Sequence, residues 1–535
     1  MLININSFGG CLPKMNPRLL PVNAAQVASN CKTETGTLRP YKNTTVFMDP
    51  PKTGLIKTIY YYLDQYVLHW LTDVDVAHGP VVNDVYNRIY WTGDGVPKVA
   101  NSQMFAAGGG TDYPNASFPL GVPVPTTAPT ITVTGVSTDE DLDESRAYVF
   151  TYVTAFGEEG PPSPSSTVVT VGPGQTVEGT FIVAPSGLNI VTKRFYRTIT
   201  GTDSTEFRMV ADVGAAVTSA YDSVASENLN EALPSLYWDG PDPNLTGIIL
   251  HPAGFMAGFH EKDVFLSEIY QPHAWPDSYK VPVEYDIIGL GIFGSSILVL
   301  TTGTPYAISG NDPSSMTVER LEINQSCMSK QGIVDVGDAI AYPSPDGLIV
   351  IGQGQAKNVT ESIYTREQWN ALSPSTMISA YHDGKYYGFL SNGTAIVLSP
   401  SGSDVTTLNI SVSAVHVSVK YDRMSLMVGD NIVRFDDSAT TNLGDIVWRS
   451  KVFVPPVPTK ALGIAQVRAS AYPLTFKLYA DGVLKHTQTV ANDEPFRLPG
   501  GYHFEEAFVE ITSQYEIYSV CAASSVTEMK KAVHP

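Results

Sequence analysis

The chain has 535 residues, of which 33 are basic and 53 acidic, so its formal net charge is −20. A chain of this length is expected to form roughly three or four domains. Phosphate binding is driven by Lys and Arg, which release counterions, so the charge argues against a protein that grips nucleic acid but not against a surface past which DNA slides. Only 16% of the residues are charged, against about 25% in a typical soluble domain. This deficit favours a surface that is partly covered by neighbouring subunits.

Residues 1–44 form an arm rich in glycine and proline. The apolar start ends at Ile3, and polar residues and glycines follow it, whereas a signal peptide needs an uninterrupted apolar core. Proline cannot pair in a central strand, so we expect no core strand in the arm. One short helical turn is predicted over AAQVASN.

The four cysteines, Cys11, Cys31, Cys327 and Cys521, are scattered, with no Cys-x-x-Cys pair and no nearby His that would complete a zinc site. The most plausible disulfide would join Cys11 to Cys31, but free thiols in a reducing cytoplasm are favoured. The longest apolar stretch, residues 287–303, is too short and too rich in glycine for a membrane span. It predicts two buried strands.

Most of the chain alternates short Val, Ile, Tyr, Phe and Thr runs with turn residues, which predicts an all-β fold. Hairpin turn signals recur at intervals of 40, 43, 37 and 47 residues, close to the repeat of four-stranded propeller blades. A further unit, VYNRIYWTGDGVPKV, precedes them. We therefore predict a β-propeller of about six blades, built from residues 45–118 and 233–447; a row of unrelated β-domains is the alternative. The turn signals centre on Asp263, Gly303, Asp346, Asp383 and Asp430.

The predicted propeller is interrupted at residues 126–225. This segment follows a Pro-rich linker and holds seven strand candidates, ITVTGV, RAYVFTYVTAF, STVVTV, VEGTFIV, TKRFYRTIT, EFRMVADV and SAYDSV. Seven strands in about 100 residues fit an immunoglobulin-like sandwich. Because no Cys or Trp marks an antibody-type core, and RAYVFTYVTAFGEEGPPSPSSTVVTV resembles fibronectin type III domains, a fibronectin III-like insert is preferred. Residues 458–535 are expected to form a C-terminal β-sandwich or platform that packs back on the propeller.

Two motifs suggest ligand sites and are rejected. Gly289, Gly291 and Gly294 match the dinucleotide fingerprint, but a strand follows them where the fingerprint needs a helix N-terminus. DEDLDES has the acidic spacing of a calcium loop, but Glu144 stands where that loop needs Gly and Phe150 where it needs Glu. We predict no cofactor and no metal site, and a solvated acidic loop at Asp139, Asp141 and Asp143.

Catalytic motifs are also missing from the sequence. Ser344-Pro-Asp346-Gly347 matches part of the sialidase repeat, but the aromatic residue of that repeat and a second copy are missing. The HEKD at His260 lacks the second His of a zinc protease motif. Acidic residues are many, but no pair can be assigned to a catalytic cleft. The sequence predicts no catalytic residue and no enzyme.

The arm is similar to the start of the tail nozzle proteins of short-tailed phages, the group of tail tubular protein B and the packaged-DNA stabilisation proteins. Further likeness lies in DIIGLGIFGSSILVLTTGTPYAISGNDP, CMSKQGI and SPDGLIVIGQGQA, so it covers the arm and most of the predicted propeller but not the insert. The matching arm residues are Gly9, Gly10, Pro13, Pro21, Asn30, Glu34, Gly36, Leu38, Arg39 and Pro40.

The resemblance implies a virion structural protein that is made in the host cytoplasm and forms a hexameric ring in the phage tail. Its implied partners are the tail adaptor, or head-to-tail connector, tail fibre or tailspike proteins, and duplex DNA that is retained and then ejected through the lumen without sequence-specific binding. The arm would either close its own propeller or cross to a neighbouring subunit. The alternatives are a phage surface adhesin that binds a receptor and, third, a glycan hydrolase. In the nozzle hypothesis, the basic side chains of the arm should face protein; they are Lys14, Arg18, Lys32, Arg39 and Lys42.

Overall fold

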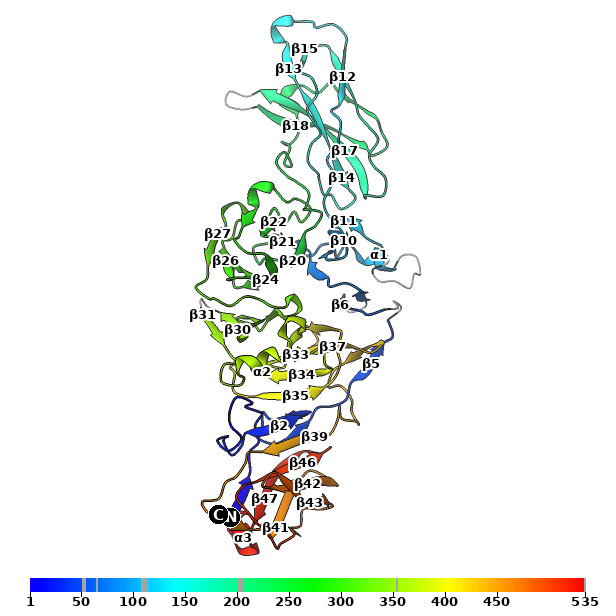
Figure 1. The fold of residues 1–535 in the computed structure, drawn as a ribbon. Coiled ribbons are helices and arrows are strands. Elements are labelled where there is room, and N and C mark those ends of the chain that lie inside the picture. Colours follow the sequence, from blue (N-terminus) through cyan, green and yellow to red (C-terminus); the bar gives the residue numbers. More distant parts are fainter. Residues whose placement is uncertain are drawn as a thin grey trace. The chain divides into compact units, whose positions relative to one another are not determined.

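The computed structural model describes residues 1–50, 54–63, 66–106, 114, 116–200, 205–352 and 355–533 (Figure 1). Strands hold 45% of the chain and helices 6%, which confirms the predicted all-β class. The chain divides into two compact units: unit 1 is Met1–Leu71, Leu300–Pro305 and Leu321–Pro535, and unit 2 is Thr72–Val299 and Tyr306–Arg320. The predicted ranges 45–118, 126–225, 233–447 and 458–535 each include a few positions outside the described residues.

Unit 2 contains three four-stranded antiparallel sheets, in each of which consecutive strands lie side by side. This meander is the strand order of a propeller blade. The strands are β8 (Asp75–His78), β9 (Ile89–Thr92), β10 (Lys98–Ala100) and β11 (Phe118–Pro119); β20 (Thr246–Leu250), β21 (Met256–His260), β22 (Asp263–Leu266) and β23 (Val281–Pro282); and β24 (Ile287–Phe293), β25 (Ser296–Thr301), β26 (Tyr306–Ser309) and β27 (Thr317–Arg320). β24 and β25 are the two strands predicted for residues 287–303. The helix α1 (Ser102–Ala106) follows β10.

The insert belongs to unit 2 and has a strand at each of the seven predicted positions. Two three-stranded sheets, β12-β16-β19 and β14-β17-β18, enclose a core of aromatic and branched side chains, and a further pair, β13-β15, adds an eighth strand. The insert is therefore a β-sandwich with its own core. Its strands are β12 (Thr130–Thr134), β13 (Glu144–Arg146), β14 (Tyr148–Thr154), β15 (Val169–Val171), β16 (Thr176–Thr180), β17 (Ile190–Thr200), β18 (Thr205–Gly214) and β19 (Ser219–Asp222).

Unit 1 contains two further four-stranded sheets of the blade type, a four-strand meander (β32–β35) that is part of a larger sheet, and one hairpin. One of the sheets is completed by a strand from the N-terminal region, β5, which pairs with β38. The strands are β28 (Val334–Asp335), β29 (Ile340–Ser344), β30 (Gly347–Gly352) and β31 (Gln355–Asn358); β32 (Ile378–His382), β33 (Lys385–Phe389), β34 (Thr394–Leu398) and β35 (Val405–Asn409); β36 (Ala414–Ser418), β37 (Arg423–Val428), β38 (Asn431–Arg434) and β5 (Thr45–Met48); and the hairpin of β6 (Thr58–Tyr62) and β7 (Tyr66–Trp70).

The predicted turn residues lie at or beside hairpin turns. Asp383 and Gly384, between β32 and β33, have φ angles of 49° and 69°, as a tight two-residue hairpin requires at both central positions. Asp263 lies in unit 2, whereas Gly303, Asp346, Asp383 and Asp430 lie in unit 1. Blade-type sheets thus occur in both units, and one continuous propeller stays a prediction.

The remainder of unit 1 is built from the C-terminal strands. A nine-stranded sheet has the order β32-β33-β34-β35-β2-β39-β46-β42-β43, and a second sheet has the order β1-β47-β41-β44. One large cluster of buried apolar side chains joins the two. The strands not yet named are β1 (Leu2–Ile5), β2 (Ala25–Ser29), β3 (Cys31–Lys32), β4 (Arg39–Pro40), β39 (Ile446–Ser450), β40 (Thr459–Lys460), β41 (Ile464–Ala469), β42 (Leu474–Ala480), β43 (Val483–Val490), β44 (Phe496–Arg497), β45 (His503–Phe504), β46 (Ala507–Ser513) and β47 (Ile517–Ala523), and the helices are α2 (Arg366–Asn370) and α3 (Val526–Val533).

Two expectations for the arm are wrong. Leu2–Ile5 is a core strand, β1, which pairs with β47 and buries Ile3 and Ile5 completely. AAQVASN is not helical: Ala25–Ser29 is the strand β2, which lies between β35 and β39. The pairing partners are more than 370 residues away in sequence, and tertiary pairing overrides the local preference for a helix.

Candidate functional site

The Gly-Gly pair of the arm forms a close backbone joint with the end of the β34–β35 connection. The Gly10 N–H donates to Asp404 Oδ2 at 2.5 Å, and the Cys11 N–H donates to the Val405 carbonyl at 2.7 Å. A Cβ on Gly10 would lie 2.6 Å from the Val405 carbonyl oxygen. This spacing explains a glycine at position 10, because no side chain fits there.

The other side of the joint is held by Trp448 on β39. Its indole Nε1–H donates to the Gly9 carbonyl at 3.1 Å, and its ring meets the Phe8 ring edge-on with centroids 5.0 Å apart. Trp448 is fully buried. The glycines of the arm are therefore enclosed by packed side chains and leave no space for a ligand.

Asn30 connects the end of β2 to the neighbouring strands β35 and β39. It has a φ of 53° and is buried, its Nδ2 donates to the Asp445 carbonyl at 3.2 Å, and its Oδ1 accepts the Asn409 N–H at 3.0 Å. Asn is one of the few non-glycine residues that adopt positive φ readily. Gly10 and Asn30 therefore fasten the arm to the neighbouring strands β35 and β39 within the nine-stranded sheet. None of these contacts has the arrangement of a catalytic site.

All five basic side chains of the arm have a contact with their own chain, although Lys14, Arg18 and Lys42 are exposed. Lys14 Nζ donates to the Glu361 carbonyl at 2.7 Å, and Lys42 Nζ donates to Asn442 at 3.3 Å. The other three pair with carboxylates: Arg18 with Glu506 at 2.7 Å, Lys32 with Asp436, and Arg39 with Glu34 at 3.4 Å. The guanidinium groups of Arg18 and Arg39 stay partly exposed. The arm therefore lies on its own chain.

All four cysteines are free and buried, so the disulfide considered between Cys11 and Cys31 is wrong. Burial raises the pKa of Cys11 and of Cys327 to about 12, and that of Cys31 still further. A thiol with such a pKa is protonated at neutral pH and is a poor nucleophile or metal ligand. These cysteines act as small apolar core residues.

The rejected motifs have ordinary structural roles. Gly289 and Gly291 lie within β24, and Gly294 has a φ of 58° in the turn that leads to β25, so no helix N-terminus faces them. Asp139 caps a short 3-10 turn by accepting the Asp141 N–H at 3.2 Å, while Asp143 accepts the Ser137 hydroxyl at 2.8 Å. Within the described part of the chain, no group of His, Cys, Asp or Glu is arranged to hold a metal ion.

The two catalytic motifs considered are not completed either. Ser344 Oγ donates to Gln325, whose amide in turn donates to Asp346 at 2.7 Å. His260 Nδ1 lies 3.3 Å from a carboxylate oxygen of Asp242, on a partly exposed surface. Neither cluster places a general base beside a nucleophile, which acyl or glycosyl transfer requires.

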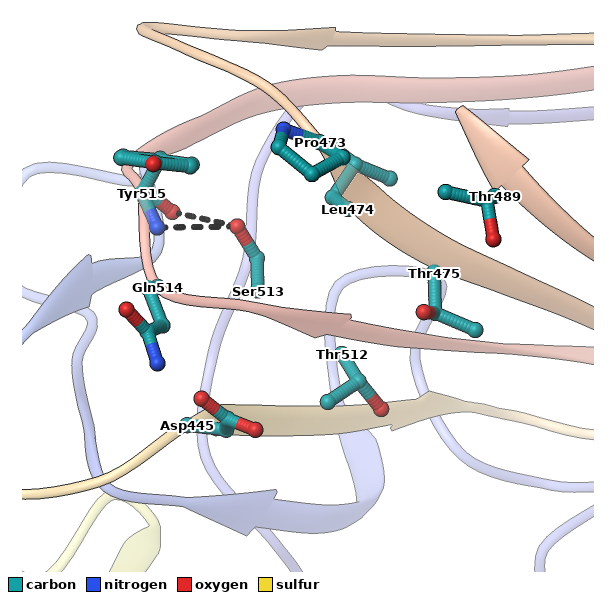
Figure 2. Close-up of a pocket in the computed structure, with 9 residues that line it drawn as sticks. All are labelled: Asp445, Pro473, Leu474, Thr475, Thr489, Thr512, Ser513, Gln514 and Tyr515. Carbon is teal, nitrogen blue, oxygen red and sulfur yellow. Dashed lines mark hydrogen bonds between the residues drawn. The ribbon is translucent and has the colours of Figure 1, made fainter. Parts of the chain in front are cut away.

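A polar pocket of about 330 Å³ opens beside the β42–β46 pair in the C-terminal sheet (Figure 2). Ser513 Oγ accepts the Tyr515 N–H at 2.9 Å and donates to the Tyr515 carbonyl at 3.0 Å, so its hydroxyl is occupied by its own turn. The one carboxylate at the wall is Asp445, with no cation among the lining residues. This lining is suited to water and offers no catalytic pair. The residues are Asp445, Pro473, Leu474, Thr475, Thr489, Thr512, Ser513, Gln514 and Tyr515.

A larger cavity, of about 600 Å³, is lined by the first strands of three successive blade sheets, β28, β32 and β36. It contains His382, whose Nδ1 lies 3.6 Å from a carboxylate oxygen of Asp422, and His416, whose ring stacks on Tyr61 with centroids 5.5 Å apart. The sequence did not indicate these residues, because Tyr61, His382 and His416 come from three different sheets. Ser379 also lines the cavity, but its hydroxyl is hydrogen-bonded to that of Tyr386. Among the described residues, no nucleophile is paired with His382 and Asp422.

Comparisons with known proteins give no family. No family model and no curated protein matches the chain. Solved structures that are similar to parts of it include BamB from Moraxella catarrhalis (8% identity, 57% of this chain and 97% of that chain, TM-score 0.25), BBS1N in complex with ARL6DN (10%, 75% and 99%, TM-score 0.30) and the WD40 β-propeller domain of Doa1 (9%, 63% and 89%, TM-score 0.24). At TM-scores this low, the likeness carries no argument about function. Among the described residues, no helix has the length and apolarity needed to cross a bilayer.

Proposed function

We propose that this chain is a structural virion protein that forms the hexameric tail nozzle of a short-tailed phage. The ring would attach below the adaptor, contact tail fibre or tailspike proteins, and conduct duplex DNA during ejection. The fold proposed with it is a propeller of about six blades, interrupted by a fibronectin III-like domain and closed by the C-terminal sheets. The arm that carries the resemblance is the basis of the proposal.

The observation that carries the proposal is that the arm's glycine and asparagine residues pack against the rest of the chain while the chain as a whole is strongly acidic. Gly10 and Asn30 of the arm, and Trp448 on β39, make contacts within the chain. The basic side chains of the arm likewise contact groups of the same chain. A net charge of −20 then leaves few cations to hold phosphate. A duplex carries one negative charge per ~1.7 Å, so an acidic lumen would let it slide under pressure. Retention before infection would depend on a steric constriction.

The same features count against an enzyme. In the described residues, buried cysteines, capped aspartates and turn-bound serines replace the nucleophile and base pairs that hydrolysis needs. Among the described residues, none of the motifs considered supplies the pair of carboxylates that a glycan hydrolase uses. A surface adhesin remains the competing proposal, and it predicts no continuous channel.

Two measurements on the purified full-length protein test the proposal. Negative-stain microscopy is expected to show a six-fold ring with a central hole wide enough for B-DNA, whereas a monomer or trimer would favour the adhesin. A salt titration of duplex binding is expected to show negligible affinity even at low ionic strength. Nanomolar affinity with a steep salt slope would contradict the low-friction channel.

A further inference from the structure

A small pocket in unit 1 brings two arginines together with aromatic and hydroxyl side chains. Its volume is about 140 Å³, and it lies on the sheet β36-β37-β38-β5 beside the β6–β7 hairpin. Strand pairing places Ser418 opposite Arg423 and Ser425 opposite Arg434, so these four side chains leave one face of the sheet. The lining residues are Phe47, Tyr61, Ser418, Tyr421, Arg423, Ser425 and Arg434.

Each of the two guanidinium groups lies near an aromatic ring. Arg434 lies over the Phe47 ring at 4.5 Å, and Arg423 lies 5.9 Å from the centroid of the Tyr421 ring. The Phe47 and Tyr61 rings are neighbours, with centroids 5.5 Å apart. Guanidinium groups over aromatic faces are attracted to the ring quadrupole. The stacking leaves their N–H edges available to a ligand.

Neither Arg423 nor Arg434 has an ion pair or a side-chain hydrogen bond to any described residue, although the chain carries a net charge of −20. Their charges converge on Tyr61: burial raises the pKa of its hydroxyl, and Arg434 and Arg423 both act in the opposite direction. That hydroxyl accepts only a long hydrogen bond, 3.3 Å, from Ser425 Oγ. Two free cations in an acidic protein make a positive site without a built-in partner.

Size and lining define the ligand. An apolar cavity of about 150 Å³ holds a single benzene ring, so this pocket takes the ring of one sugar unit only if the other substituents extend into solvent. Two guanidinium groups suit a carboxylate, which they bind through paired N–H donors. Aromatic faces suit the flat C–H face of a sugar, and the hydroxyls of Ser418, Ser425, Tyr61 and Tyr421 can exchange hydrogen bonds with its hydroxyls.

We propose that this pocket binds an acidic monosaccharide unit, a hexuronic acid, with the carboxylate held between Arg423 and Arg434 and the ring against the aromatic side chains. Such units occur in acidic polysaccharides, and one unit would fill the pocket. The sugar site does not depend on the hexameric assembly or the DNA channel proposed above. The sugar-binding proposal and the nozzle proposal can therefore fail independently of each other. A duplex backbone is too large for it.

The test is calorimetric titration of the full-length protein with glucuronate, with glucose as the neutral ring and inorganic sulfate as the bare anion. Glucuronate is expected to bind with millimolar affinity that weakens as salt is added. Replacing both arginines, Arg423→Gln with Arg434→Gln, is expected to weaken binding at least about tenfold. The control Arg497→Gln changes an arginine on β44, outside the pocket lining, and should leave binding unchanged.

Further measurements distinguish recognition of the carboxylate from recognition of the sugar ring. Arg434→Lys keeps the charge but not the paired donors, so it should retain the fold and still weaken glucuronate binding; circular dichroism and the melting temperature check the fold. Glucose binding as tight as that of glucuronate would overturn the role of the arginines. Sulfate binding as tight as that of glucuronate would overturn recognition of the ring, and undetectable glucuronate binding would overturn the proposal as a whole.

Discussion

Arg88 and Glu158 form a buried ion pair at the base of the insert, with 2.6 Å between Nη1 and Oε1 and each side chain 7% exposed. Arg88 precedes β9, and Glu158 lies in the loop after β14, so the pair joins the sandwich to a blade-type sheet of the same unit. Arg88 also donates to Asp84 at 2.7 Å. Burial raises the pKa of Glu158 against the opposing effect of Arg88. The insert is therefore fastened by a polar contact that depends on both partners.

The first prediction concerns this pair. Arg88→Met leaves Glu158 buried without its cation, which typically costs about 3–5 kcal/mol of unfolding free energy. Adding Glu158→Gln to that variant should recover part of the loss, so that the two changes together cost less than their sum. Urea denaturation of the four proteins measures this coupling.

The matched control is Arg320→Met in the same unit. Arg320 pairs with Glu284 at 3.4 Å, but both side chains are about half exposed. Exposed pairs contribute about 0–1 kcal/mol. If Arg88→Met costs no more than Arg320→Met, the buried pair does not fasten the insert.

The second prediction is that the insert can be removed. Replacing residues 126–225 with a short Gly/Ser linker should leave a soluble protein, because the sandwich has its own core. Removal uncovers Val122, which packs on that core and is 3% exposed. We therefore expect Val122→Thr to improve the solubility of the shortened chain, as less apolar surface is exposed. Insoluble protein in both forms, or loss of the β signature in circular dichroism, would contradict modularity.

Local chemistry made part of this fold predictable. Asp383-Gly384 indicates a hairpin because both positions need positive φ. In the insert, β12 and β16 alternate in burial as strands of a sandwich do, whereas β14 is buried throughout. The run YTREQWNALS favours a helix on its residue types, and α2 lies within it, with a capping box at Thr365.

The unpredicted features depend on partners that are distant in sequence. β1 becomes a strand because it pairs with β47, and β2 because it pairs with β39 and β35. The alternation of apolar and polar residues in β1 and β2 is too weak to predict a strand from their sequences alone. The arginine pocket likewise needs Phe47 and Tyr61 from the N-terminal region beside Arg423 and Arg434. No residue spacing within a single segment of the sequence predicts that these four side chains line one pocket.

The third prediction tests the joint at Gly10. In Gly10→Ala the new methyl group would meet the Val405 carbonyl oxygen at 2.6 Å, so the arm must shift. Overpacking of this kind costs typically about 1–3 kcal/mol. Faster trypsin cleavage at Lys14 and Arg18 should accompany the loss, because the arm is loosened. Gly500→Ala is the control, since its Cβ would meet nothing within 4 Å; equal stability and equal cleavage of the two variants would contradict the joint.

The last prediction concerns acid stability. His273 is 3% exposed, and its Nε2–H donates to the Glu159 carbonyl at 3.0 Å. Burial lowers its pKa to about 4, and the nearby Arg88 acts in the same direction, while the hydrogen bond to Glu159 opposes both. The imidazole is therefore neutral in the folded protein at pH 7, and protonation is disfavoured there.

The pKa of His273 in the folded and in the unfolded chain determines whether acid raises or lowers the unfolding free energy. Between about pH 6.5, the ordinary pKa of His, and pH 4, the unfolded chain binds a proton at this position and the folded chain does not. The unfolding free energy thus rises with pH in this window, and the contribution of His273 is lost as the pH falls. The expected loss is about 3 kcal/mol between pH 7 and pH 4.

Urea denaturation from pH 7 to pH 4 of the wild type and of His273→Gln measures this contribution. The glutamine amide can still donate to the Glu159 carbonyl but does not titrate, so the variant should lose less stability in acid than the wild type. Carboxylates whose pKa is lowered by their partners, such as Asp84, also lose stability in acid, but they do so equally in both proteins and cancel in the difference. His260→Gln, at a partly exposed histidine, is the control for the loss of an imidazole. Parallel curves for the wild type and His273→Gln would show that His273 does not govern acid stability.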